Sequence, residues 1–129
     1  MNAARAYARA TSETASRERL MVLLFEAALR HMRVAAGHLE TKQPALALPL
    51  LTKASDIVTE LAGTLDTTVS PELADTLGQI YLFVAQRLAI AAFSKDAAVV
   101  REAERAFVPV VEGFQQAVAT LGADAAGAR

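Results

Sequence analysis

The 129-residue sequence contains no cysteine and few of the residues that interrupt helices, with 6 glycines and 4 prolines. The absence of cysteine excludes disulfides and thiolate metal sites, and it fits a reducing compartment. Apolar residues make up 53% of the chain, which argues against disorder over most of its length. The length and composition therefore predict one helical domain with a single core.

An excess of one sign of charge is also missing. Lysine and arginine number 13 and aspartate and glutamate 14, for a net charge of −1 and no basic block. Nucleic-acid binding therefore has no electrostatic support. The first twenty residues lack the continuous apolar stretch of a secretory signal, and no apolar run reaches the ~20 residues that cross a bilayer. We expect a soluble cytoplasmic protein that does not insert into a membrane.

Motifs for catalysis are missing as well. Di-iron bundles need Glu-x-x-His pairs on two helices, and neither His31 nor His38 has a glutamate three residues earlier. The sequence has no glycine-rich phosphate loop and no Gly-x-Ser-x-Gly. A phosphotransfer bundle carries an exposed histidine in a His-x-x-Lys-Gly signature, which is absent around His31. The sequence thus predicts no enzyme, no cofactor and no metal, with a phosphohistidine at His31 as a minor alternative.

Four amphipathic segments separated by short breaks cover most of the chain, at residues 17–40, 44–65, 71–94 and 97–121. Pro44 and Pro71 suit the first turn of a helix, where a missing N–H costs nothing. Ser16, Ser70 and Asp96 suit the N-cap position. We therefore predict an all-α fold, an antiparallel four-helix bundle over residues 16–121. A flexible N-terminal arm (1–15) precedes it, and a disordered tail (122–129) follows.

The first helix is more apolar than a bundle helix needs to be. Between residues 20 and 32, ten of thirteen side chains are apolar, whereas packing on one side takes a stripe of roughly 100°. One apolar face contains Leu20, Leu23, Leu24, Ala27, His31, Val34 and Ala35. A second contains Met21, Phe25, Ala28, Leu29, Met32, Ala36 and Leu39. Either the arm or a neighbouring helix covers the surplus face, or that face binds an amphipathic helix of a partner.

Three segments in order resemble the flagellin-specific export chaperone family (FliS type). The first is Tyr7, followed nine residues later by Ser16 and then by Leu20-x-x-x-Leu24-Phe25-Glu26-x-Ala28-Leu29. The second is Leu50-x-x-Lys53-Ala54-x-Asp56-Ile57-Val58-x-Glu60-Leu61-x-x-Thr64-Leu65-Asp66. The third is Leu77-x-x-Ile80-Tyr81 with Arg87-Leu88-x-x-Ala91. Phe114 stands where the family usually has a tryptophan. The sequence departs from the family pattern at Arg17, at Leu82-Phe83 and at Ala92, and it lacks the glycines that often follow the leucine-aspartate pair.

The resemblance implies a cytoplasmic chaperone without catalytic activity. Such proteins bind the disordered C-terminal segment of flagellin, prevent its early polymerisation and deliver it to the export gate of the flagellar type III apparatus. It also implies that the arm covers an apolar groove, with Tyr7 as the plug. Besides Tyr7, which the resemblance implies, our candidate docking residues are the apolar ones surplus to a single core stripe: Met21, Phe25, Leu29, Met32, Leu82 and Phe83. The competing hypothesis is a helical-bundle adaptor or self-associating module without a flagellin client. We expect a monomer or weak dimer.

Overall fold

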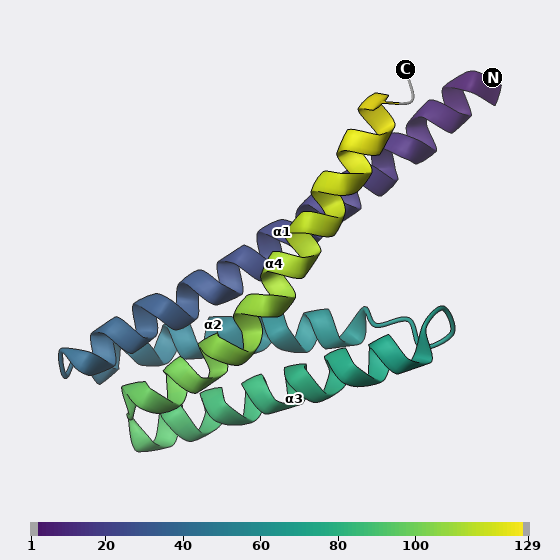
Figure 1. The fold of residues 1–129 in the computed structure, drawn as a ribbon. Helices are drawn as coiled ribbons and strands as arrows, with labels where there is room; N and C mark the ends of the chain where they lie inside the picture. The colour runs from purple at the N-terminus through teal and green to yellow at the C-terminus, as the bar shows by residue number, and fades with distance from the viewer. Residues whose placement is uncertain (1–2, 128–129) are drawn as a thin grey trace.

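A computed structural model describes the backbone of residues 3–127 and the side chains of residues 3–5, 9 and 16–122. Over this part of the chain it contains four helices and no strand: α1 (Ala3–Glu40), α2 (Pro44–Gly63), α3 (Pro71–Ser94) and α4 (Ala97–Gly127). Each helix packs against two others in the order α1, α2, α3, α4 and back to α1, which closes a ring. The predicted all-α bundle is confirmed (Figure 1).

The predicted breaks between helices hold, with different capping chemistry at each. Pro44 and Pro71 both occupy the first turn of their helices. Asp96 caps α4, because its Oδ1 accepts a hydrogen bond from the backbone N–H of Ala98 at 2.9 Å. Ser70 occupies the N-cap position of α3, but its side chain makes no capping hydrogen bond. Its carbonyl oxygen instead accepts from the N–H of Ala74 at 2.9 Å, so the start of α3 relies on backbone bonds.

The first and last helices, α1 and α4, are longer than the sequence predicted. α1 begins at Ala3 rather than near Arg17, and α4 continues to Gly127 rather than ending near Leu121. Both extra segments are rich in alanine and contain no proline, the strongest helix breaker, although the extension of α4 includes Gly122 and Gly127. In Figure 1 both extensions run past the α2–α3 pair toward the same end of the molecule. That the N-terminal segment detaches as an arm stays a prediction.

The core settles which face of α1 is buried. Phe25, Leu29 and Met32 are buried in the bundle, at 2%, 8% and 0% exposure, whereas Leu20 and Leu23 on the other face are more than half exposed. The face that we assigned to docking is thus mainly the core face. The stripes predicted for the other helices supply most of the remaining core, through the buried residues Leu51, Ala54, Val58, Leu61, Tyr81, Val84, Leu88, Ala91, Val100, Ala103 and Phe107.

One described helix, α3, is long and apolar enough to cross a membrane by length and composition alone. A single such helix is weak evidence for a membrane span, because core helices of soluble proteins pass the same test. Here α3 packs against α2 and α4 through Tyr81, Val84 and Leu88. Only 22% of its most apolar window is buried inside the bundle, however, so the core accounts for only part of its composition.

Candidate functional site

The largest concavity described is an apolar groove of about 1000 Å³ near the start of α3. Its walls come from α1, the loop between α2 and α3, α3 itself and the second half of α4. The apolar side chains that line it include Met21, Phe25, Leu65, Leu73, Leu77 and Phe114. Polar groups of Glu18, Thr64 and Asp66 also line it. The groove is therefore suited to an apolar segment with some polar atoms.

Packed aromatic side chains form the base of the groove. The Phe25 ring lies 4.9 Å from the Phe114 ring and 5.8 Å from the Phe107 ring, centroid to centroid, both at tilted angles. Such tilted pairs stabilise a core beyond the area that they bury. Tyr81 is 3% exposed, and its burial raises the pKa of the phenol, so the ring stays neutral. The base of the groove is thus fixed by core residues, while its walls carry the accessible surface.

The α2–α3 loop forms one wall and is held by local hydrogen bonds. The Asp66 carboxylate accepts hydrogen bonds from the backbone N–H of Thr68, at 2.9 Å, and from the Thr68 hydroxyl. These bonds lower the pKa of Asp66 and keep it charged. The Thr64 hydroxyl donates to the carbonyl of Leu61 at 2.7 Å. Val69 in this loop is 80% exposed and Leu73 at the start of α3 is 56% exposed, so both contribute apolar surface to the groove.

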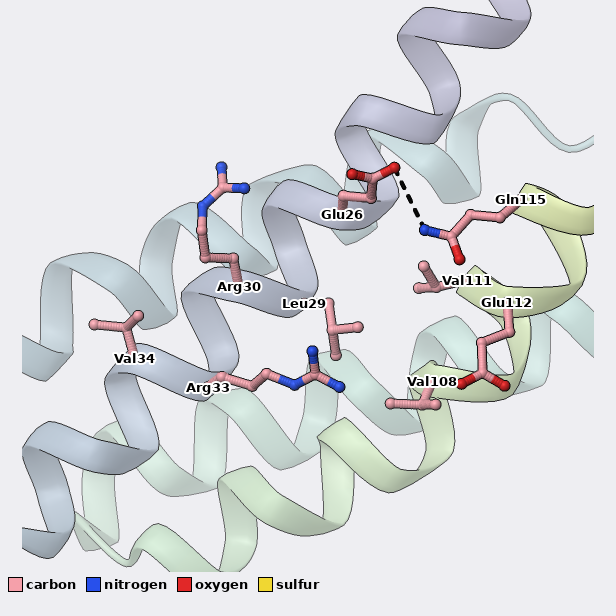
Figure 2. Close-up of a pocket in the computed structure, with 9 residues that line it drawn as sticks. All are labelled: Glu26, Leu29, Arg30, Arg33, Val34, Val108, Val111, Glu112 and Gln115. Carbon is pink, nitrogen blue, oxygen red and sulfur yellow. Dashed lines mark hydrogen bonds between the residues drawn. The ribbon is translucent and has the colours of Figure 1, made fainter. Parts of the chain in front are cut away.

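A second, smaller concavity of about 460 Å³ lies between α1 and α4 and has a different character (Figure 2). Leu29, Val108 and Val111 line it together with charged and polar side chains from both helices: Glu26, Arg30, Arg33, Glu112 and Gln115. The Gln115 amide donates to Glu26 across it at 3.4 Å. Charges of both signs line this site, so burying an apolar segment here would desolvate them. It is the weaker candidate for an apolar ligand.

The residues predicted to dock a partner fall into different environments. Met21 and Phe25 line the groove, although Phe25 is only 2% exposed. Leu29 and Met32 belong to the core and offer almost no surface, because α1 turns that face toward the other helices. Leu82 and Phe83 are 59% and 38% exposed, but they lie on α3 outside the groove lining. The side chain of Tyr7 lies outside the described residues.

Several groove residues were not predicted as docking residues. Leu73, Leu77 and Phe114 match a core stripe, so periodicity assigns them to packing. In the structure Leu73 is 56% exposed, and Leu77 and Phe114 are only partly buried, so all three line the groove. The one hint in the sequence is Val69, an apolar residue in a polar break that a packed core does not require.

The histidine considered for phosphotransfer lies apart from the groove. His31 is partly buried on α1, and burial, Arg30 and Lys53 together lower its pKa. The neutral imidazole is thereby favoured near neutral pH. Among the described residues, no group of three or more His, Cys, Asp or Glu side chains is placed to hold a metal ion.

Comparison with known protein families places the chain in one of them. A family model described as flagellar protein FliS matches residues 1–121. No curated protein matches the chain significantly. The family match spans α1, α2, α3 and α4 as far as Leu121, and it includes every residue that lines the groove.

Proposed function

Since the chain belongs to the FliS family of flagellar proteins, a family of chaperones rather than enzymes, we propose that it is a cytoplasmic export chaperone for flagellin. The client is the disordered C-terminal segment of flagellin. Binding covers apolar residues of that segment, prevents premature polymerisation and keeps the subunit deliverable to the flagellar type III export gate. The apolar groove is the observation on which this proposal depends.

The size of the groove favours a short amphipathic helix as its occupant. A helix about 10 Å across fills 1000 Å³ with roughly two turns. Two turns present apolar anchors at positions i, i+3 or i+4, and i+7, the pattern by which helices bind grooves. The driving force is burial of apolar surface at roughly 25 cal/mol per Å², less the cost of ordering the client. No cofactor or nucleotide is needed for this function.

The N-terminal segment supplies the regulation in this proposal. By resemblance to the family, residues 1–15 cover the groove in the free chaperone, and Tyr7 is the side chain that the client displaces. Met21 and Glu18, the first described α1 side chains at the groove, continue directly from this segment along the helix. In the structure this segment continues α1 past the α2–α3 pair (Figure 1), so covering the groove requires it to leave the line of the helix.

Calorimetric titration with a peptide of the last ~40 residues of the host's flagellin tests this function. A segment of that length buries 1,000–3,000 Å² on coupled folding, so we expect saturable one-to-one binding with a negative heat-capacity change. A peptide of the same composition in scrambled order is the control, because it lacks the apolar spacing. Absence of binding by a folded chaperone would reject flagellin as the client and leave the adaptor hypothesis.

A further inference from the structure

The outward face of α3 carries apolar side chains that neither the core nor the groove accounts for. We call it the α3 strip, and it consists of Leu82, Phe83, Ile90 and Phe93. Leu82 is 59% exposed, Ile90 43% and Phe93 90%. These residues lie within one stretch of three turns on the side of α3 that faces away from the bundle. An apolar patch of this kind is a candidate interaction surface.

The α3 strip is free of charge over its length. From Thr76 to Ser94 the helix has a single ionisable group that is charged at neutral pH, Arg87. Its guanidinium lies 5.3 Å from the centre of the Phe83 ring, and its Nη1 lies 3.4 Å from a carboxylate oxygen of Glu102 on α4. Arg87 therefore turns toward its own molecule. A surface without charge can meet an identical surface without repulsion.

The shape of the strip distinguishes its occupant from that of the groove. Its residues line neither the large groove nor the α1–α4 concavity, so the strip is a helix ridge. A disordered segment bound to a ridge must be ordered without the enclosure that a concave site provides. A second folded copy presents a helix surface that is already ordered. Two helices pack when the rows of side chains on one fit between the rows of side chains on the other. We propose that the α3 strip is the interface of a symmetric, antiparallel dimer of this chain.

The distribution of charge at the ends of α3 selects the antiparallel orientation. Leu82 precedes Gln86 by four residues and Ile90 follows it by four. A two-fold axis beside Gln86 therefore places Leu82 against the partner's Ile90. It also directs the acidic start of α3, with the exposed carboxylates of Glu72 and Asp75, toward the partner's Lys95. The amide of Gln86 both donates and accepts, so it can bond to its own symmetry copy. A parallel pair would instead place the acidic starts together.

The area available predicts a weak dimer. Taking ~200 Å² for each large apolar side chain, the exposed fractions in the strip amount to roughly 450 Å² per copy. The pair buries roughly 900 Å² in apolar side chains, which is at the small end for specific interfaces. With such an interface, we expect the protein to be mainly monomeric at low micromolar concentration and mainly dimeric at a few hundred micromolar.

Sedimentation equilibrium of the full chain tests the interface directly. The average mass of the wild type should rise from 13.7 kDa toward twice that value between about 5 and 500 µM. Leu82→Glu brings two carboxylates into the interface and should weaken the dimer by about tenfold or more. Leu46→Glu is the matched control, because Leu46 is 53% exposed on α2 and should leave the association unchanged. Far-ultraviolet circular dichroism confirms that both variants fold.

A charge exchange tests the orientation. Asp75→Lys alone, or Lys95→Glu alone, places like charges opposite one another and should raise the dissociation constant about threefold. The double variant restores opposite charges in an antiparallel dimer and should recover wild-type association at low salt. Failure of the double variant to recover would overturn the antiparallel arrangement.

Three outcomes would overturn the interface itself. The first is a wild type that stays monomeric over the whole concentration range. The second is a monomeric wild type whose affinity for the flagellin peptide falls in Leu82→Glu, which would assign the strip to the client. The third is a monomeric wild type that binds vesicles of phosphatidylcholine, which would assign the strip to a lipid surface. The peptide titration with wild type reports on the proposed function separately.

Discussion

Replacing Leu73 by alanine should weaken client binding without a matching effect on the fold. Leu73 lines the groove with 56% of its surface exposed, so a bound segment covers surface that the free protein leaves open. Full burial of a leucine is worth about 1.5–3 kcal/mol, and covering the exposed half recovers roughly 1–1.5 kcal/mol. Truncation to alanine removes most of that gain, which corresponds to a dissociation constant about five- to tenfold higher.

The chain contains a closely matched control for this substitution. Leu46 is 53% exposed and is the third residue of α2, after Pro44 and Ala45, just as Leu73 is the third residue of α3, after Pro71 and Glu72. Leu46 does not line the groove. The two alanine variants should therefore lose similar free energy of unfolding, on the order of 1 kcal/mol, from the buried half of each side chain.

Calorimetric titration with the flagellin peptide measures the affinities, and urea unfolding measures the stabilities. The reasoning predicts that only Leu73→Ala weakens binding. Equal affinities for the two variants, or a larger loss for Leu46→Ala, would show that the groove near the start of α3 is not where the client binds. A stability loss confined to Leu73→Ala would show that the two sites are not matched and would remove the control.

Three further predictions address the core, the histidine and the N-terminal segment. Phe25→Ala should lower the free energy of unfolding by about 3–5 kcal/mol, because the ring is buried against Phe107 and Phe114; a loss below about 1 kcal/mol in urea unfolding would contradict its place in the core. The folded state lowers the pKa of His31 below its ordinary value of 6.5. As the pH falls, the unfolded chain therefore binds a proton at His31 before the folded chain does. The contribution of His31 to stability is complete above pH 6.5 and is lost as the pH falls through 6.5 and below. Unfolding measured near pH 7.5 and near pH 5.5 should show this loss in the wild type and less of it in His31→Gln, and an equal loss in both would assign it to other groups. Tyr7→Ala should raise the association rate of the flagellin peptide in stopped-flow measurements and slightly lower the melting temperature of the free chaperone; no change in either argues against a plug.

Much of the fold follows from local chemistry. The bundle, its four amphipathic segments and the breaks near Pro44, Pro71 and Asp96 were predictable, because helix periodicity and start signals operate within a few residues. The helix ends were less predictable. Alanine-rich sequence extends α1 and α4 beyond the predicted limits, since a missing stop signal is harder to recognise than a present one.

The candidate site was only partly predictable. The surplus of apolar surface on the first helix was correctly recognised, but the choice between its two faces was wrong for Leu29 and Met32. Both faces have helical spacing and similar composition, so the local pattern does not separate them. Leu73 shows the opposite error. Periodicity places it in a core stripe, whereas in the structure it lines the open groove.

By itself, then, the sequence determined the class of fold, the positions of the four helices and the resemblance to a chaperone family. The tertiary structure decided which face of α1 is core, where the apolar groove lies, and that the outer face of α3 stays open. The physical reason is that periodicity records how apolar each face is, whereas burial depends on which other helix lies opposite. Which helix lies opposite a given face is set by the packing of all four helices together.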